Sequence, residues 1–433
     1  MPLAHRFIDY RAAVLIVIAN MIGTGVFATL GLQAQGVQDG AALLLLWLLG
    51  GLVALCGALS YAELAAALPR SGGEYRFLSR IYHPALGQLA GWVSVTVGFS
   101  APIALAAVAL GRYLAAVLPV DPMAVAVSTV LAATALHAFD LGLGRTFQVV
   151  STLAKVLVIV LFCIAGLWHV FAEGPAPGSV SPLPSDSTLA AIGTAAFAQS
   201  LIYVSFAYSG WNAAAYVADE VKEPQRTVPR AMVHGTLAVT GLYLVLNLTF
   251  LLTIGLDDLA GTVEVGAYSA HRIFGATGGL LVTLLLGVVL MSSISAMALA
   301  GPRVLQAIGE DIPGLRPLSK RNRRGAPTRA VLLQQGLALA LVLTDSFEAV
   351  LTFAGFTLTL FAFLTVAGLM RLRRREPQLL RPFRVPLYPL PPLVFLVVSG
   401  VSLLAVAWER PLAIAVAALI AAGGWLLWRL ARR

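Results

Sequence analysis

The chain is built from long apolar runs, each about the length that carries a helix across a bilayer. A helix rises about 1.5 Å per residue, so roughly 20 apolar residues span a hydrocarbon core about 30 Å thick. Of the 433 residues, 59% are hydrophobic and 11% are charged, against about 25% charged in a typical soluble domain. The sequence therefore predicts an all-α integral membrane protein.

Twelve such runs are predicted as transmembrane helices, and together they form a single transmembrane domain over residues 1–433 with no separate soluble domain. The longest predicted loops cover 172–188, 255–275, 309–327 and 371–387. The twelve predicted spans are 11–34, 41–68, 86–118, 122–138, 147–171, 189–217, 229–254, 276–308, 328–344, 347–370, 388–407 and 411–429.

Lys and Arg alternate between rich and poor loops along this list of spans, and basic loops stay in the cytoplasm. We expect an integral, multi-pass protein of the cell (inner) membrane with both termini cytoplasmic. The net charge of +9 follows from this topology, so membrane lipids are expected as partners and nucleic acid is not. The poor side holds Arg272 and Arg410. The rich side holds Arg6, Arg70, Arg76, Arg80, Arg145, Lys222, Arg226, Arg230, the run from Arg316 to Arg329, the segment "MRLRRREPQLLRPFR", Arg429, Arg432 and Arg433.

The first span contains the stretch "NMIGTGVF" near its middle, with Gly23 and Gly25 on either side of Thr24. Small residues often mark close packing between membrane helices. However, two glycines and a β-branched Thr within three residues also weaken a helix. A break at membrane depth is tolerated where the freed backbone groups are buried in protein or line a cavity. We therefore expect non-helical backbone around Ile22–Gly25.

The sixth span carries a matching interruption, "YVSFAYSGWNAAAY", with Ser205, Ser209, Gly210 and Asn212 among apolar neighbours. Spans one and six would each begin a five-helix repeat, at 11–172 and 189–372, with two further helices within 388–430. Because five is odd, the second repeat would run inverted relative to the first. Transporters with inverted repeats bind their substrates between two such broken helices, and we expect the second break around Phe206–Gly210.

Three segments resemble transporters of the amino acid–polyamine–organocation (APC) superfamily, in particular the bacterial members of the L-type amino acid transporter branch. They are "NMIGTGVF", "SYAELAAALPRSGGEYRFLSRIY" and "SFAYSGWNAAAYVADEVKEPQRTVPRAM". The resemblance implies the leucine-transporter fold, with a 5+5 inverted repeat and broken helices one and six. It also implies alternating-access transport of amino acids, most readily neutral L-amino acids, without sodium.

The resemblance further implies which residues bind substrate. Backbone around Ile22, Gly23, Thr24 and Gly25 would hold the substrate's carboxylate and amino group. Phe206 corresponds to an aromatic gate, and backbone around Phe206, Ala207 and Ser209 would share the amine. Asn212 corresponds to an Asn of the L-type members, where a branch that exchanges arginine has Glu.

Lys155 lies about nine residues, or roughly 13 Å, into the fifth span. The side chain of a lysine at this depth either reaches back to the interface or serves a function inside the membrane. By resemblance, Lys155 would replace the sodium ion of coupled relatives, close to helix one and to Ser293 of the eighth span. Proton symport and exchange both remain open.

Other classes of protein lack their signatures here. A membrane enzyme would need a catalytic cluster at depth, a channel would need filter loops, and an ATP-driven pump would need a Walker sequence. No cofactor or metal site is expected. A carrier of cationic amino acids or polyamines is the alternative within transport, ranked lower because the two breaks contain no acidic residue. The turn "LPVDPM" has no cysteine, so no disulfide-linked heavy chain is expected, and Cys56 and Cys163 are interpreted as apolar core residues.

Overall fold

The computed structural model describes residues 8–139, 141–179, 181–344 and 346–431. Four basic residues from the predicted topology, Arg6, Arg432, Arg433 and the side chain of Arg145, lie outside the described residues. The described part is helical: α1 Tyr10–Met21, α2 Thr24–Ala28, α3 Leu30–Gly36, α4 Gly40–Ala67, α5 Glu74–Ile81, α6 Pro84–Val93, η1 Ser94–Phe99, α7 Ser100–Ala115, α8 Pro122–Phe139, α9 Leu141–Glu173, α10 Asp186–Ile192, α11 Ala195–Ala207, α12 Ala213–Tyr216, η2 Ala218–Glu220, α13 Pro224–Thr253, α14 Leu256–Leu259, α15 Val265–Asp311, η3 Pro313–Leu318, α16 Thr328–Val342, α17 Phe347–Arg375, α18 Leu390–Glu409 and α19 Pro411–Ala431.

Eight helices of the described chain are long and apolar enough to cross a membrane. The pair α10 and α11, bent by 73° at a short break, would make a ninth span. Three shorter apolar helices lie in α8, α16 and α19. All of these helices fall on the apolar runs from which the spans were predicted, because the hydrophobic surface that a bilayer requires is recorded directly in the sequence.

The predicted loop at 255–275 is wrong, because it contains α14 and the first turns of α15. These turns bury Val265, Ala267 and Ala270 but expose His271 and Arg272. A helix with one polar face scores poorly in a hydropathy window, which explains why the sequence placed its beginning too late. At Gly275 (φ 67°, ψ −169°) the helix is kinked.

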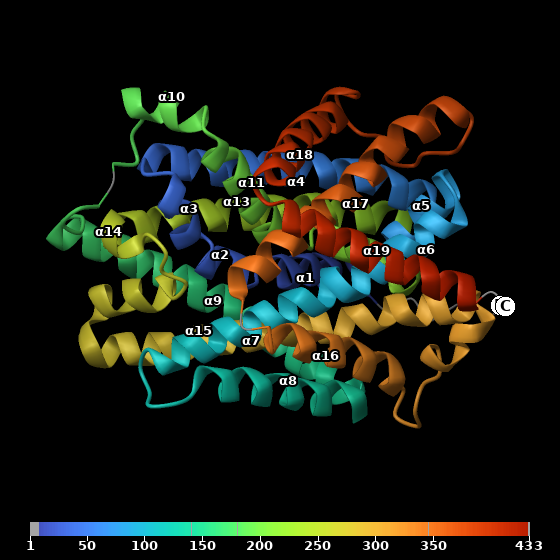
Figure 1. Cartoon of the computed structure of the whole chain (residues 1–433), viewed down its shortest axis with the longest axis horizontal. Coiled ribbons are helices and arrows are strands. Elements are labelled where there is room, and N and C mark those ends of the chain that lie inside the picture. Colours follow the sequence, from blue (N-terminus) through green and yellow to red (C-terminus); the bar gives the residue numbers. More distant parts are fainter. Residues whose placement is uncertain (1–7, 140, 180, 345, 432–433) are drawn as a thin grey trace.

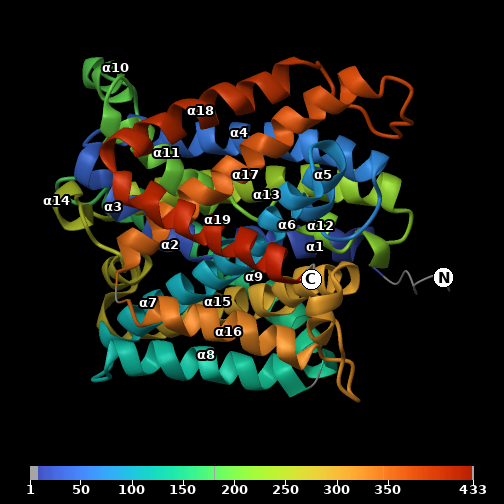
Figure 2. The ribbon, with the colours of Figure 1, turned by 45° about the vertical axis from the view of Figure 1, so that its right-hand side comes forward.

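Helices that lie one predicted repeat apart pack against each other. The contacting pairs are α4 with α13, α7 with α15, and α8 with α16. In Figures 1 and 2, α8 and α16 lie together along one side of the molecule, while α18 lies along the opposite side. Between these sides, α1 contacts α13 and α15, so the first broken helix is surrounded by protein.

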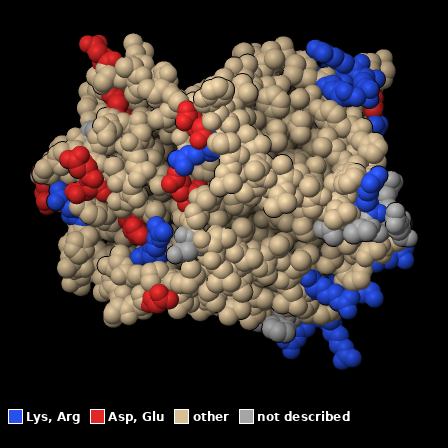
Figure 3. All heavy atoms as spheres, viewed as in Figure 1, with Lys and Arg blue, Asp and Glu red and all other residues tan. Residues whose placement is uncertain are grey.

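Charge is distributed unevenly along the helix axes. Figure 3 shows Lys and Arg gathered at one end of the molecule, while most of the visible Asp and Glu lie toward the other. The first end, which we call the basic end, is where α1 begins, where α19 ends and where α5 lies (Figure 2). The broken helices therefore cross between two ends of different charge.

Candidate functional site: two helix breaks around a polar pocket

The first break consists of Ile22 and Gly23, between α1 and α2. Ile22 has φ −75° and ψ 97°, and Gly23 has φ −132° and ψ −156°, so both are extended. The break is shorter than the predicted Ile22–Gly25, because Thr24 and Gly25 already belong to α2. The first N–H groups of a helix have no acceptor within that helix, so backbone donors face the end of α1 here.

Two side chains from other helices bind the carbonyl that ends α1. Lys155 Nζ of α9 donates to the Ile22 oxygen at 2.7 Å, and Ser293 Oγ of α15 donates to the same oxygen at 2.8 Å. Lys155 also donates to the Ala19 oxygen at 3.2 Å and to Ser293 Oγ at 3.0 Å. With 1% of its surface exposed, Lys155 does not reach the membrane interface. It joins three helices at the first break.

The second break comprises Tyr208–Asn212, between α11 and α12. It begins two residues later than predicted, because Phe206 and Ala207 still belong to α11. Gly210 adopts φ +100°, and a Cβ at this position would lie 2.6 Å from the carbonyl oxygen of Asn20. The residue must therefore be glycine, both for its conformation and for its contact. This contact places the second break directly on the end of α1.

The two breaks share two adjoining pockets. The smaller, with a volume of about 20 Å³, is lined by Gly23, Thr24, Gly25, Phe206, Ala207, Ser209 and Ser293, among others. The larger, about 90 Å³, is lined by Ser209 and Asn212 together with Tyr208, Trp211 and Tyr216. Asn20, Ser209 and Met297 line both pockets. Of the predicted substrate-binding residues, Ile22 lines neither pocket, because its side chain is buried and its carbonyl is bound by Lys155.

Gly25 has a packing role that the sequence left as the lesser alternative. A Cβ on Gly25 would lie 2.4 Å from Ala207 Cα, so the missing side chain allows α2 to approach α11. A Cβ on Gly23 would meet nothing within 4 Å. The two glycines of the motif thus differ: Gly23 lies at the break and Gly25 lies at a helix contact.

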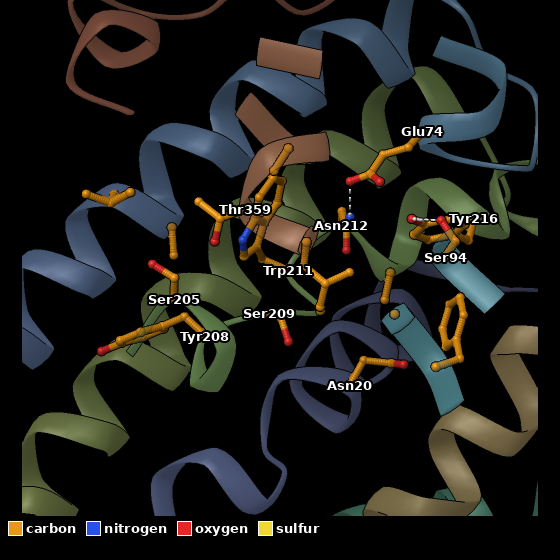
Figure 4. Close-up of a pocket in the computed structure, with 18 of the residues that line it drawn as sticks. Asn20, Glu74, Ser94, Ser205, Tyr208, Ser209, Trp211, Asn212, Tyr216 and Thr359 are labelled. Atoms are coloured by element: carbon orange, nitrogen blue, oxygen red, sulfur yellow. Dashed lines mark hydrogen bonds between the residues drawn. The ribbon is translucent and has the colours of Figure 1, made fainter. Parts of the chain in front are cut away.

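Sequence reasoning missed three residues of this region. Asn20, just before the motif, donates to the Ile16 oxygen but leaves its own buried side-chain oxygen without a partner (Figure 4). The Tyr243 hydroxyl lies 2.6 Å from the Met21 oxygen and 3.1 Å from the Ala207 oxygen, which joins the ends of α1 and α11. Glu74 of α5 lines the larger pocket. A polar residue next to a predicted break was the available signal for Asn20, whereas Tyr243 and Glu74 come from distant segments.

Cys56 and Cys163 are free and buried, as predicted. Glu63 pairs with Arg373 and Arg381. Within the described chain, no group of three His, Cys, Asp or Glu side chains could hold a metal ion.

Broken membrane helices that meet at a polar pocket are the arrangement found in secondary transporters. The family model described as amino acid permease matches residues 8–422, and the chain belongs to this family. The protein is therefore a membrane transporter of amino acids, as the resemblance implied.

Several characterised transporters are similar to the chain over most of its length. It is 28% identical to the serine/threonine exchanger SteT of Bacillus subtilis (strain 168), with 88% of this chain and 86% of that protein covered. It is 26% identical to the mouse b(0,+)-type amino acid transporter 1, with 94% and 84% covered. It is 25% identical to the human cystine/glutamate transporter, with 88% and 77% covered.

Proposed function

We propose that this protein is a secondary active transporter of neutral L-amino acids that works by alternating access in the inner membrane, independently of sodium. The observation that carries the proposal is the meeting of the two breaks at one pocket, with a lysine ammonium bound to the end of α1. A buried cation held by protein atoms replaces the ion that a sodium-coupled carrier would have to recruit.

We further propose twelve transmembrane spans in the leucine-transporter fold. The eight long helices, the bent pair and the three shorter helices supply these spans, with inverted repeats at 11–172 and 189–372 and additional helices within 388–430. The packing of α4 on α13, α7 on α15 and α8 on α16 supports the repeats, since elements related by a two-fold axis contact one another near that axis.

In this proposal the substrate lies across the smaller pocket. Backbone at Gly23, Thr24 and Gly25 binds the carboxylate, because the first amides of α2 lack helical acceptors. Backbone near Phe206, Ala207 and Ser209 binds the amine. The unpartnered oxygen of Asn20 adds an acceptor for an ammonium group that the sequence did not identify.

Phe206 closes over the substrate and Asn212 steadies the second break in this proposal. Lys155 and Ser293 hold the break in the place of a sodium site. The three acceptors around the Lys155 ammonium, which are the carbonyls of Ala19 and Ile22 and the hydroxyl of Ser293, support a fixed structural role, so that coupling to protons would need another group.

The basic end is assigned to the cytoplasm by the positive-inside rule, so both termini lie inside. The transporter works without a disulfide-linked heavy chain, because its two cysteines are both buried. A second candidate function, transport of cationic amino acids or polyamines, is favoured by one observation: the carboxyl of Glu74 lines the larger pocket.

Transport assays with purified protein in proteoliposomes test the proposal. Uptake of radiolabelled L-alanine, L-serine, L-threonine and L-leucine is compared with that of L-arginine and putrescine, in the presence of sodium or choline. We expect uptake of neutral amino acids that rises with internal amino acid or an inward proton gradient and does not need sodium. Uptake restricted to arginine or putrescine, or dependent on sodium, would contradict the proposal.

A further inference from the structure

Two carboxyl groups are buried near the basic end, and they have opposite surroundings. Glu63 is fully buried and binds Arg373 and Arg381, and it also accepts a hydrogen bond from the backbone N–H of Val385 at 2.8 Å. Glu74 is 4% exposed, and no ion pair to it occurs within the described residues. Burying a carboxylate without a nearby cation costs free energy. The burial of Glu74 therefore needs another explanation.

The carboxyl of Glu74 lies between α4 and the second break. Its Oε1 accepts a hydrogen bond from the Tyr61 hydroxyl at 2.6 Å and one from Asn212 Nδ2 at 3.4 Å. Figure 4 shows Glu74 and Asn212 directed toward each other on the side of the larger pocket opposite Asn20. The same carboxyl is therefore in contact with the pocket and with a broken helix.

Among the described residues, no neighbouring positive charge offsets the negative charge of an ionised Glu74. The ionisable groups that face it are the hydroxyls of Tyr61 on α4 and Tyr216 on α12. Four arginines on α5 and the adjacent α17 have other partners. These contacts are Arg76 with Asp311, Arg80 with Glu376, Arg373 with Glu63, and Arg371 with the ring of Tyr82.

The local backbone holds Glu74 in this position. Gly73 has φ +50°, and a Cβ there would lie 2.6 Å from the ring of Tyr216, so glycine lets the beginning of α5 pack against α12. On the other side, the rings of Tyr61 and Trp211 are in edge-to-face contact, with centroids 4.6 Å apart. Of the two hydrogen-bond partners of the carboxyl, Asn212 thus belongs to the second break and Tyr61 packs against it.

Burial raises the pKa of Glu74 to about 7, although the hydrogen bond from Tyr61 acts in the opposite direction. A carboxyl with a raised pKa is protonated in the buried state and ionises when water reaches it. Low pH therefore favours the conformation in which Glu74 is buried, and this preference is lost as the pH rises through the raised pKa.

We propose that Glu74 is a proton-binding site of the transport cycle, loaded from the larger pocket beside the substrate site and emptied at the basic end. The carboxylate takes a proton from pocket water to form the neutral acid, and it returns the proton to water when movement of α5 exposes the group. This inference rests on the proposed function and names the group that couples transport to protons.

Infrared difference spectroscopy of the purified protein tests the site without any substrate. We expect the carbonyl stretch of a protonated carboxyl to disappear with a midpoint near pH 7, and we expect Glu74→Gln to lack this band. Tyr61→Phe should shift the midpoint upward, because it removes a hydrogen bond that stabilises the carboxylate. Glu223→Gln, which changes an exposed carboxyl near the same end, is the matched control and should leave the titration unchanged.

Uptake of radiolabelled L-alanine into proteoliposomes supplies the second readout. Around a midpoint of about 7, the protonated fraction falls about tenfold between pH 6 and pH 8. We expect wild-type uptake to vary with pH over this range and to respond to a proton gradient. We expect Glu74→Gln to be insensitive to both, while Glu223→Gln behaves as wild type.

The two readouts separate the proton site from the proposed function. A titration midpoint below about 5, near that of an ordinary carboxyl, would overturn the proton site, as would wild-type pH dependence in Glu74→Gln. Loss of arginine binding in that variant, without a change in the pH profile of uptake, would instead assign the carboxyl to the substrate. Absence of L-alanine uptake together with a Glu74 titration near pH 7 would count against the neutral-amino-acid function and leave the proton site standing.

Discussion

The two helix breaks differ in how the surrounding protein holds them. At the first, Lys155 and Ser293 bind the carbonyl of Ile22, and both come from helices outside the pair of broken helices. At the second, Tyr208–Asn212 line the larger pocket, and Asn212 bonds to the carboxyl of Glu74. The first break is joined to α9 and α15 and contributes only Gly23 to the smaller pocket, whereas all five residues of the second break border the larger one. We therefore expect the second break to move more during transport, and the variants below test this difference from the largest expected effect to the smallest.

Gly25→Leu should have the largest effect, because the added side chain overlaps Ala207 of α11. Overpacking usually costs about 1–3 kcal/mol and occasionally more, and here the clash is with backbone. We expect a large fall in thermal stability, measured by differential scanning fluorimetry in detergent. Gly23→Ala is the control, since its Cβ meets nothing within 4 Å. Equal stability of the two variants would show that the glycines are equivalent.

Lys155→Met should have the second-largest effect. The substitution keeps an apolar stem of similar length but removes the cation from the Ile22 and Ala19 carbonyls, and a buried group left unsatisfied costs about 1–3 kcal/mol. We expect amino acid uptake in proteoliposomes to fall more than tenfold, with a smaller loss of thermal stability. Wild-type uptake would mean that the first break is held without the ammonium.

Gly210→Ala should destabilise the protein by about 1–3 kcal/mol, because its Cβ would approach the Asn20 oxygen from a strained backbone conformation. Gly336→Ala in α16 is the matched control, since its Cβ has nothing within 4 Å and alanine favours a helix by about 0.5–1 kcal/mol. Thermal unfolding of the two variants should move in opposite directions. A Gly210→Ala variant as stable as wild type would contradict the close contact between the two breaks.

Tyr243→Phe should have the smallest effect. It removes the hydroxyl that contacts the Met21 and Ala207 carbonyls, for a net loss of about 0.5–1.5 kcal/mol. We expect a modest decrease in thermal stability and a changed rate of amino acid exchange, because the ends of α1 and α11 become less tightly joined. An unchanged exchange rate would place their coupling elsewhere.

The sequence predicted the spans and the presence of two interruptions, because hydrophobic length and glycine-rich stretches are local properties. It did not predict where the first interruption ends or where the second begins, since Thr24 and Phe206 are stabilised as helix by packing rather than by their own preferences. Lys155 was recognisable as a lone charge at depth. Tyr243 and Glu74 were not, because each becomes part of the site through contacts with residues far away in the sequence.

Protection of an introduced cysteine tests most directly whether an amino acid binds between the two breaks. Ser209 lines both pockets, and the native Cys56 and Cys163 are buried, so alkylation of Ser209→Cys reports on the site. We expect a transported amino acid to slow this alkylation and to leave Ser181→Cys, on an exposed loop, unaffected. Equal alkylation of Ser209→Cys with and without that amino acid would contradict a substrate site between the breaks.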